Sequence, residues 1–410
     1  MFRPSLFRGL SLETPDVTSY GLARSRRASL SAEQRRKLSM LRTNSIPSPL
    51  TPVSHIYHLV PCPRNCCTQK YVVSTDRSGD IHVHVQGDLS QQDKRCVFLT
   101  VHDLGTNHSS IVDFISTPAM SEIKERSCFI HVDVPGHEEN SPDLPDSYQF
   151  PSLQTLGEDI ITVLDFLHVR YAIGLGEGAG ANILARCGLA HPRRLLGLIL
   201  VNCTGSTSSV ADAFRTRFSR WRGADISQSE EDFLIYHKFG HVSYTQDVDF
   251  KYQQISSESI EACERERMLT EYRSRLRGNL NTHNIKLYVK AFINRKDLVL
   301  RGCQADILLI TGMLSPYSSV VEKLYKELDR DKVTILKVEK AGDVLAEAPA
   351  KVAQSLLLFC QGQGQLTSLP PPGVERRMSR AMSMEEYDKP NIRRLSLTPS
   401  VSDSPPPRKL

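Results

Sequence analysis

The chain has 410 residues with 51 basic and 46 acidic side chains, a formal net charge of +5. Its length allows one large domain or two of ordinary size. It contains no run of about 18 apolar residues, which argues against a membrane-spanning helix. The start of the sequence lacks the apolar segment of a secretory signal, and the ten cysteines are scattered, as is typical of reduced thiols. We therefore expect a cytoplasmic protein.

The positive charge is concentrated at the two ends of the chain. Residues 1–50 have a net charge of +6 and residues 361–410 a net charge of +3, which leaves −4 for residues 51–360. Both ends are rich in Ser, Arg and Pro and show no apolar period, so residues 1–53 and 363–410 are predicted to be disordered tails. Basic tails of this kind can contact an acidic membrane surface. We expect no nucleic-acid partner.

Residues 54–362, between the tails, are predicted to form one α/β domain. Strands that alternate with helices form a mostly parallel sheet with helices on both faces. Residues 205–300 interrupt the alternation with a polar, mostly helical segment, which we expect to be a lid. The other predicted elements are a β-hairpin at 71–85, strands at 96–101, 127–132, 172–173, 195–201, 307–311 and 333–338, and helices at 152–168, 181–190, 318–328 and 349–358.

A glycine-rich segment follows the predicted strand at 172–173. The sequence Gly174-Leu175-Gly176-Glu177-Gly178 has the spacing of G-x-S-x-G, the sharp strand-to-helix turn that exposes the nucleophile of α/β-hydrolases. In this alignment the nucleophile position is Gly176, which has no side chain. The segment therefore predicts an α/β-hydrolase fold without its nucleophile.

Two further positions of the expected active site also lack the required groups. The acid of a Ser-His-Asp triad should follow the strand at 307–311, where the sequence has Ser315, and the base should follow the last strand, where it has Asp343. Neither side chain can perform the expected role. Together with Gly176, these positions predict a pseudoenzyme.

The loop after the strand at 96–101 is where active α/β-hydrolases hold an oxyanion. The Asp103 carboxylate is unfavourable there, because it lies close to where negative charge would develop. We expect this loop and Glu177 to line a vestigial pocket. The loop residues are His102, Asp103, Leu104 and Gly105.

Other chemistries remain open as alternatives. Glu177 could act as a displaced nucleophile or base, although an acidic residue at a helix start is also stabilised by the helix dipole. Gly174, Gly176 and Ala179 match a weak form of the dinucleotide-binding fingerprint, but the next strand does not end in an acidic residue. One cluster of ligand-type side chains matches no known zinc spacing, so we expect neither a metal nor a cofactor: His55, His58, Cys62, Cys66 and Cys67.

Several motifs, in order along the chain, carry a family resemblance. They include Val101-His102-Asp103-Leu104-Gly105, His131-Val132-Asp133-x-Pro135-Gly136, Tyr148-Gln149-Phe150-Pro151, the glycine-rich segment and Asn294-Arg295-Lys296-Asp297-Leu298. With these motifs, residues 70–362 resemble the N-myc downstream-regulated (NDRG) family, a non-catalytic branch of the α/β-hydrolase fold. The resemblance implies a cytoplasmic protein without demonstrated hydrolase activity, linked to signalling, stress response, differentiation and trafficking. It also implies protein partners and phosphorylation by basophilic kinases. The long basic N-terminal extension departs from the family pattern.

Arg-x-x-Ser motifs occur in both tails and offer arginines to a basophilic Ser/Thr kinase. Each phosphate adds about −1.5 to −2 charges, so three phosphates would neutralise the N-terminal tail. This predicts an electrostatic switch in which the bare tail binds acidic membranes and the phosphorylated tail is released. The candidate sites are Ser29, Ser39, Ser45, Ser379, Ser383 and Ser396.

The leading hypothesis from the sequence is thus a non-catalytic signalling or scaffold protein. One alternative is a hydrolase with an unorthodox active site. The other is a small-molecule or lipid carrier that uses the emptied pocket.

Overall fold

The computed structural model describes residues 68–206, 226–240 and 257–370, with the backbone alone for 257–262. The six candidate phosphorylation sites and the His/Cys cluster at 55–67 lie outside the described residues. Residues 363–370 fall in the predicted C-terminal tail, yet Leu366 and Leu369 are buried. The ordered domain therefore continues beyond its predicted end at residue 362.

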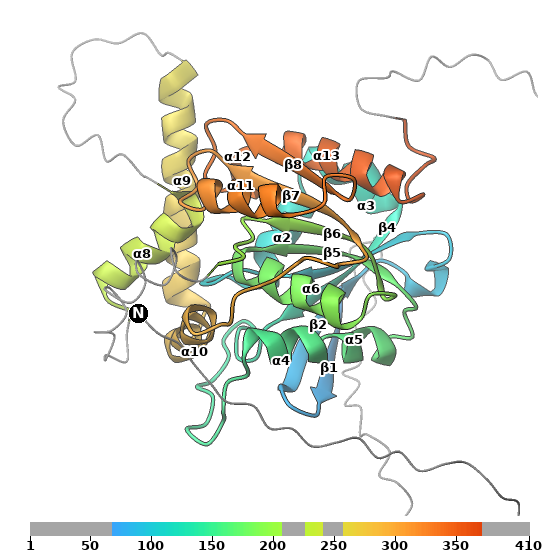
Figure 1. The fold of residues 1–410 in the computed structure, drawn as a ribbon. Coiled ribbons are helices and arrows are strands. Elements are labelled where there is room, and N and C mark those ends of the chain that lie inside the picture. Colours follow the sequence, from blue (N-terminus) through green and yellow to red (C-terminus); the bar gives the residue numbers. More distant parts are fainter. Residues whose placement is uncertain (1–67, 207–225, 241–256, 371–410) are drawn as a thin grey trace, which may run out of the picture. The chain divides into compact units, whose positions relative to one another are not determined.

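Eight strands form one sheet in the order β1-β2-β4-β3-β5-β6-β7-β8 (Figure 1). β2 is antiparallel to β1 and β4, and the remaining neighbouring pairs are parallel. This arrangement confirms the predicted mostly parallel α/β sheet. The strands are β1 (Thr68–Thr75), β2 (Gly79–Gln86), β3 (Cys96–Val101), β4 (Ser127–Asp133), β5 (Ala172–Glu177), β6 (Leu195–Val201), β7 (Asp306–Gly312) and β8 (Val333–Val338).

Each face of the sheet has its own apolar core, because successive strand residues point to opposite faces. In β3, Val97, Leu99 and Val101 join one core, whereas Cys96 and Phe98 join the other. The first core is covered by α4 (Leu153–Asp159), α5 (Ile161–Phe166), α6 (Gly178–Ala190) and α11 (Ser318–Glu327). The second is covered by α2 (His108–Ile115), α3 (Ser121–Glu125), α12 (Val344–Glu347) and α13 (Pro349–Gly362).

Most predicted elements are confirmed within a few residues, but two differ. The helix predicted at 152–168 is divided at Ile160 into α4 and α5. The strand predicted at 172–173 continues through the glycine-rich segment to Glu177. The second difference moves the expected catalytic turn.

In the described part of the segment predicted to be a lid, three helices lie between β6 and β7 (Figure 1). They are α8 (Gln228–Phe239), α9 (Ser257–Gly278) and α10 (Thr282–Ile293). A capping box at Ser227 and Glu230 starts α8, and the Ser227 N–H donates a 2.7 Å hydrogen bond to Glu230 Oε2. Leu234 of α8, Leu276 of α9 and Tyr288 of α10 all join the first core. The three helices therefore pack directly on the sheet domain.

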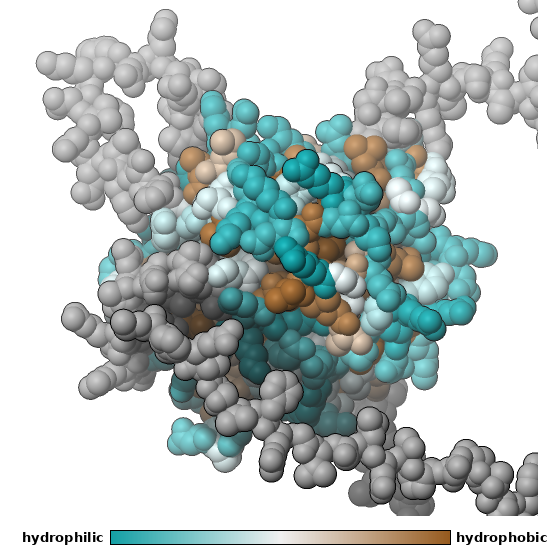
Figure 2. Space-filling view, viewed as in Figure 1, coloured by the Kyte–Doolittle hydropathy of each residue, from teal (hydrophilic) through white to brown (hydrophobic). Residues whose placement is uncertain are grey.

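The surface drawn in Figure 2 is mainly hydrophilic, with hydrophobic residues in small patches. Exposed large hydrophobic side chains include Val299, Met313 and Leu358, which belong to different parts of the fold. Scattered residues of this kind do not define a docking surface. None of the helices in the described ranges is long and apolar enough to cross a membrane.

Candidate functional site at the carboxyl edge of the sheet

The sharp turn between β5 and α6 lies at Gly178, two residues later than predicted. Gly176 is a strand residue that pairs with Val101 and Leu200. Gly178 has a φ of 51°, in the left-handed region, and is the first residue of α6. A nucleophile elbow holds its reactive residue at such a strand-to-helix turn. The nucleophile position is therefore Gly178, and its placement at Gly176 is wrong.

The glycines on either side of this turn allow α6 to approach the sheet closely. A Cβ on Gly176 would lie 2.7 Å from the Ala181 nitrogen, and one on Gly180 would overlap the Val101 carbonyl oxygen. Both neighbours are backbone atoms, which cannot rotate away as a side chain can. The glycine spacing thus follows from helix–strand packing as well as from the turn.

The Asp103 carboxylate occupies the space beside Gly178. Its Oδ1 accepts a 2.8 Å hydrogen bond from the Ala179 N–H, and a Cβ on Gly178 would overlap the same carboxylate. In active α/β-hydrolases, the N–H of the residue after the nucleophile helps to hold the oxyanion. Here that N–H binds a fixed negative charge. The turn therefore has no room for a nucleophilic side chain, and this amide is already in use.

The other residues of the loop after β3 have structural contacts. His102 Nδ1 lies 2.8 Å from the Asp103 carbonyl oxygen, and Nε2 accepts a 3.1 Å hydrogen bond from the Val134 N–H. These partners place the proton on Nδ1, and burial lowers the pKa of His102, which keeps the ring neutral. Leu104 is fully buried, and Gly105 adopts a φ of 65° that favours glycine.

Helix α8 inserts a buried ammonium group between Glu177 and Asp343. Lys238 Nζ lies 2.8 and 3.0 Å from the two Glu177 oxygens and 3.0 Å from Asp343 Oδ2. The Asp343 side chain also accepts hydrogen bonds from the N–H groups of Leu345 and Ala346, and so caps α12. The residue at the predicted base position is thus a helix cap and a counter-charge.

The residue before Lys238 connects α8 to Asp103. His237 Nε2 lies 2.8 Å from Asp103 Oδ2, and Nδ1 contacts the Tyr317 hydroxyl. An ionised carboxylate only accepts, so Nε2 carries a proton. The order hydroxyl, imidazole, carboxylate is that of a catalytic triad. Burial, however, raises the pKa of Tyr317 well above its usual range, which is the opposite of nucleophile activation.

Asp103, Glu177, His237, Lys238 and Asp343 form one buried group, which we call the lid cluster. Burial would raise the pKa of Asp103, but the interaction with His237 outweighs it and lowers the pKa to about 2. Burial raises the pKa of Glu177 to about 7, with Asp343 adding to the effect and Lys238 opposing it. Burial would lower the pKa of Lys238, but Asp343 and Glu177 together raise it above its usual range. Lys238 is therefore the fixed cation, and Glu177 is a weaker acid than Asp103.

Ser315, at the predicted acid position, supports this arrangement indirectly. It is buried, and its Oγ accepts a 3.3 Å hydrogen bond from the Tyr317 N–H, which helps to place the Tyr317 ring beside His237. His237 and Lys238 are functional residues that the sequence motifs did not predict. The one local sign of them is an adjacent pair of ionisable residues inside an apolar helical stretch at 233–239.

A second group consists of the buried His84 and Asp133 and the half-buried His108, and we call it the strand cluster. Asp133 Oδ2 lies 3.1 Å from His84 Nε2 and 2.7 Å from His108 Nδ1, and Oδ1 accepts a 2.7 Å bond from the His108 N–H. Burial would raise the pKa of Asp133, but the hydrogen bonds from His108 and His84 lower it well below its usual range.

The strand cluster offers three metal-ligand atoms within 4.8 Å of one another. The two imidazole rings are stacked, with centroids 3.6 Å apart and planes 16° apart. An ion bound by both ring nitrogens should lie near both ring planes, and nearly parallel planes do not allow that. The geometry therefore favours two imidazoles hydrogen-bonded to one carboxylate over a metal centre.

The glycine-rich segment also has no geometry for a dinucleotide. Gly174 and Gly176 lie inside β5, and the Ala179 N–H at the start of α6 already binds Asp103. A pyrophosphate at this helix start would face the carboxylates of Asp103 and Glu177. Phosphate binding at a helix N-terminus needs free amides and no adjacent negative charge.

A cavity of about 360 Å³ adjoins the lid cluster. It lies between α2, α9 and α12, and Gly105, Lys238 and Asp343 form part of its wall. Asp103, Glu177 and His237 do not line it. The most catalyst-like side chains of the cluster are therefore separated from this cavity.

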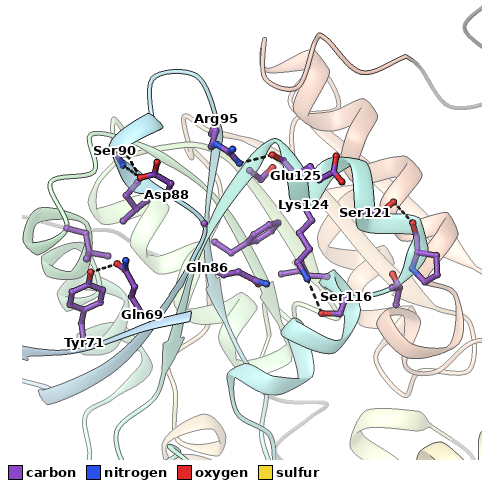
Figure 3. Close-up of a pocket in the computed structure, with 18 of the residues that line it drawn as sticks. Gln69, Tyr71, Gln86, Asp88, Ser90, Arg95, Ser116, Ser121, Lys124 and Glu125 are labelled. Carbon is purple, nitrogen blue, oxygen red and sulfur yellow. Dashed lines mark hydrogen bonds between the residues drawn. The ribbon is translucent and has the colours of Figure 1, made fainter. Parts of the chain in front are cut away.

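A larger hollow of about 1310 Å³ lies at the opposite, amino ends of β3 and β4 (Figure 3). Arg95 donates a 2.7 Å hydrogen bond to the Glu125 carbonyl oxygen, and Lys124 Nζ lies 3.4 Å from Ser116 Oγ. These cations bind local backbone and hydroxyl groups. Ligands of open α/β sheets bind at the carboxyl ends of the strands. We therefore take the carboxyl edge of the sheet, and not this hollow at the amino ends, as the candidate functional site.

Comparison with known sequences identifies the family. The model described as the Ndr family matches residues 71–367. The chain belongs to this family. It is 37% identical over 336 residues to the uncharacterised Caenorhabditis elegans protein ZK1073.1. The aligned part covers 80% of this chain and 95% of that protein. It is 30% identical over 310 residues to NDRG1 of Xenopus tropicalis. This alignment covers 73% of this chain and 72% of that protein. The resemblance seen in the sequence is confirmed.

Solved structures of hydrolases share the fold of this Ndr family member. A thermophilic esterase from Thermogutta terrifontis matches with a TM-score of 0.55 at 14% identity, covering 72% of this chain and 99% of that one. A hydrolase from Pseudomonas aeruginosa matches with a TM-score of 0.51 at 16% identity, covering 71% and 97%. Likeness at this identity shows the fold alone. It confirms the predicted α/β-hydrolase fold.

Proposed function

We propose that this Ndr family member is a non-catalytic protein built on the α/β-hydrolase fold. The observation that carries the proposal is the position of Asp103. Its carboxylate fills the space beside Gly178 and binds the Ala179 N–H, so the turn lacks both a nucleophile and a free oxyanion donor. An acyl-transfer site needs both.

The rival function, a hydrolase with an unorthodox site, would use Glu177. Both oxygens of this carboxylate are bound by Lys238, and the side chain does not line the neighbouring cavity. A nucleophile must reach the reacting carbon at about 3–3.5 Å. The arrangement therefore disfavours attack by Glu177.

Two measurements test the absence of catalysis. A fluorophosphonate probe should leave the full chain unlabelled, and hydrolysis of p-nitrophenyl acetate should equal that of the heat-denatured protein. Glu177→Gln and the matched surface variant Glu266→Gln should give the same rates. Ester hydrolysis that Glu177→Gln abolishes and Glu266→Gln preserves would overturn the proposal in favour of the rival.

The proposal extends to a role in cytoplasmic signalling, stress response or differentiation, exerted through protein partners. Family membership supports this role. The net charge of +6 over residues 1–50 and the six Arg-x-x-Ser motifs support regulation by a basophilic kinase acting on the tails. The kinase would act on Ser29, Ser39 and Ser45 at one end and Ser379, Ser383 and Ser396 at the other.

Sedimentation with phosphatidylserine vesicles tests the electrostatic switch. Binding of the untreated full chain should be strong at low salt and fall after treatment with a basophilic kinase, because each phosphate removes attraction to the anionic surface. A variant with the three N-terminal candidate serines changed to alanine should keep its binding after the same treatment. Equal binding before and after phosphorylation of the unchanged protein would contradict the switch.

A further inference from the structure

The hollow at the amino ends of β3 and β4, which we call the amino-end hollow, is larger than a small-ligand site. Its volume of about 1310 Å³ exceeds the range of roughly 300–1,000 Å³ found for such pockets. Its walls come from β1, from the loop between β2 and β3, from α3 and from the ends of α2 and α5 (Figure 3). A hollow of this size suits a segment of polypeptide better than a small molecule.

One wall of the amino-end hollow is apolar and only partly covered. The Phe166 side chain at the end of α5 is 37% exposed, and its ring packs edge-on against Tyr71 with centroids 5.9 Å apart. The Tyr71 hydroxyl donates a 2.6 Å hydrogen bond to Gln69 Oε1, which leaves the ring as an apolar surface (Figure 3). Leu89 and Leu167 are half-buried and line the same hollow. Large apolar side chains gathered in one place are typical of an interaction surface.

The polar groups of the hollow suit an uncharged segment. Its charged residues are two of each sign, so they give no preference for an ionic partner: Asp88, Glu125, Arg95 and Lys124. Among the described residues, Lys124 Nζ has only a 3.4 Å contact with Ser116 Oγ. This ammonium group can therefore donate to the carbonyl oxygens that an extended segment brings with it.

The chain itself contains such a segment directly before β1, outside the described residues. Residue 54 is the predicted start of the domain, and residues 55–63 contain no Asp, Glu, Lys or Arg. They include Ile56, Tyr57, Leu59 and Val60. Residues 371–410, which follow the described domain, carry eight basic and five acidic side chains and fit a charge-balanced apolar hollow less well.

The position of Thr68 places residues 55–63 within reach of the hollow. Thr68 is the first residue of β1, and Gln69 and Tyr71 of the same strand already line the hollow. Leu59 precedes Thr68 by nine residues, which span up to about 30 Å when extended. The distance along β1 from Thr68 to Tyr71 is only about 10 Å. A short tether also gives an effective concentration on the order of 1 mM, so contacts of modest intrinsic affinity are sufficient.

We propose that residues 55–63 fold back into the amino-end hollow, where Ile56 and Leu59 cover the apolar wall that Tyr71, Phe166 and Leu167 form. The occupied hollow is an intramolecular interface between the sheet domain and the segment that precedes it. This interface goes beyond the proposed function. It depends neither on the absence of ester hydrolysis nor on phosphorylation of the tails.

Photo-crosslinking of the full chain tests the interface. Phe166 is replaced by p-benzoylphenylalanine, which on irradiation forms a bond to a neighbouring C–H group, and the digested products are mapped by mass spectrometry. Crosslinks within one molecule should join position 166 to residues 55–63. The control places the same amino acid at Met313, a 54% exposed residue that follows β7 at the opposite, carboxyl edge of the sheet, and it should give little or none of this crosslink.

Substitutions in the segment locate the contact. With p-benzoylphenylalanine at position 166, the pair Ile56→Ser and Leu59→Ser should lower the crosslink yield about tenfold or more, because two buried apolar side chains are lost. The pair Ile46→Ser and Leu50→Ser removes the same two residue types outside the segment and should leave the yield unchanged. Both pairs precede β1, so neither changes a residue of the described core.

Limited digestion with chymotrypsin provides a readout that needs no variant. In the unmodified chain, cleavage after Tyr57 should be about tenfold slower than cleavage after Tyr20, because a docked segment must leave the hollow before it can enter the protease. Tyr20 belongs to the predicted disordered tail and serves as the internal reference. The pair Ile56→Ser and Leu59→Ser should bring the two rates together.

Any of three results would overturn the interface. The crosslink from position 166 could omit residues 55–63, the Ile56 and Leu59 substitutions could leave its yield unchanged, or Tyr57 could be cut as fast as Tyr20. A crosslink between two molecules would assign the hollow to a second copy of the chain and would also contradict the proposal. The digestion uses the unmodified chain, so a failure of the position 166 variant to fold would not protect it. Hydrolysis of p-nitrophenyl acetate alongside a protected Tyr57 would count against the proposed function and leave this interface intact.

Discussion

The lid cluster and the strand cluster are both largely buried and combine carboxylate with histidine side chains, but their charges are balanced differently. In the strand cluster one carboxylate, Asp133, serves two imidazoles and a backbone N–H. In the lid cluster three carboxylates share Lys238 and His237. The pKa of Asp133 is therefore lowered, whereas that of Glu177 is raised to about 7. Burial acts to raise the pKa of both acids. The number of hydrogen-bond donors and cations available to each carboxylate decides whether its pKa is finally raised or lowered.

The two clusters also differ in what they connect. The strand cluster joins β2, β4 and the start of α2, all within the sheet domain. The lid cluster joins the ends of β3 and β5 and the start of α12 to α8, which comes from the segment between β6 and β7. The packing of the lid cluster thus depends on a helix from the segment between β6 and β7. This difference predicts which substitutions are most damaging.

The largest effect is expected from Lys238→Met. The change removes the shared cation and leaves the buried carboxylates of Glu177 and Asp343 next to each other. Breaking a buried ion pair from one side costs about 3–5 kcal/mol in the free energy of unfolding. Urea denaturation at pH 7 measures the loss, with Lys290→Met, an exposed lysine on α10, as the control that should change stability by less than about 0.5 kcal/mol.

Adding Glu177→Gln should recover part of the stability lost in Lys238→Met, because one of the unpaired charges disappears. Residues in direct contact show coupling energies of about 0.5–3 kcal/mol in such cycles. Additive losses would show that the two side chains do not share one buried network.

Gly178→Ser should cost about 2–4 kcal/mol, from overlap with the Asp103 carboxylate and from the left-handed backbone at this residue. It should not create hydrolysis, because the Ala179 N–H stays bound to Asp103. In an Asp103→Ala background the cost of Gly178→Ser should fall by at least about 1 kcal/mol.

Gly176→Ala is the matched control for that cycle. Its new Cβ would meet backbone atoms of Gly180 and Ala181, so its cost should be the same with or without Asp103. If Asp103→Ala relieved Gly176→Ala instead of Gly178→Ser, the turn would have been assigned to the wrong glycine.

Asp133→Asn should cost about 1–3 kcal/mol, less than Lys238→Met. The amide oxygen can still accept a hydrogen bond from one of the imidazoles, and the change removes a buried charge instead of leaving one without a partner. Thermal melting with and without zinc sharpens the contrast. A zinc-dependent rise in Tm that is lost in Asp133→Asn would contradict the hydrogen-bonded assignment and establish a metal site.

The sequence was sufficient to predict the strands of the sheet, but not the side-chain contacts within the lid cluster. The apolar runs at 96–101 and 195–201 matched β3 and β6, because a strand buried on both faces leaves a continuous apolar signal. The turn at Gly178 was placed two residues early, because four closely spaced glycines allow more than one register. The partners of Glu177 and Asp103 lie on α8, about 60 and 134 residues further along the chain, and no local pattern specifies such contacts.

The last prediction separates the clusters by pH. The folded pKa of Glu177, about 7, lies above its usual value of 4.5, so its contribution to stability is full below pH 4.5 and is lost as pH rises through 7. The contribution of Asp133, with its lowered pKa, is instead lost on acidification. His102, His131 and His137 are buried and have lowered pKa values, so they also destabilise the fold in acid.

Because those groups change together in the unmodified protein, the informative quantity is the difference between a variant and that protein at each pH. The unfolding free energy of Glu177→Gln relative to the unmodified protein should rise between pH 5 and 7, by at most about 1.4 kcal/mol per pH unit. Asp133→Asn should show no such rise and should differ from the unmodified protein least at low pH. A flat difference for Glu177→Gln across this range would mean that Lys238 alone neutralises Glu177, and the excess of carboxylates in the lid cluster would then have no energetic consequence.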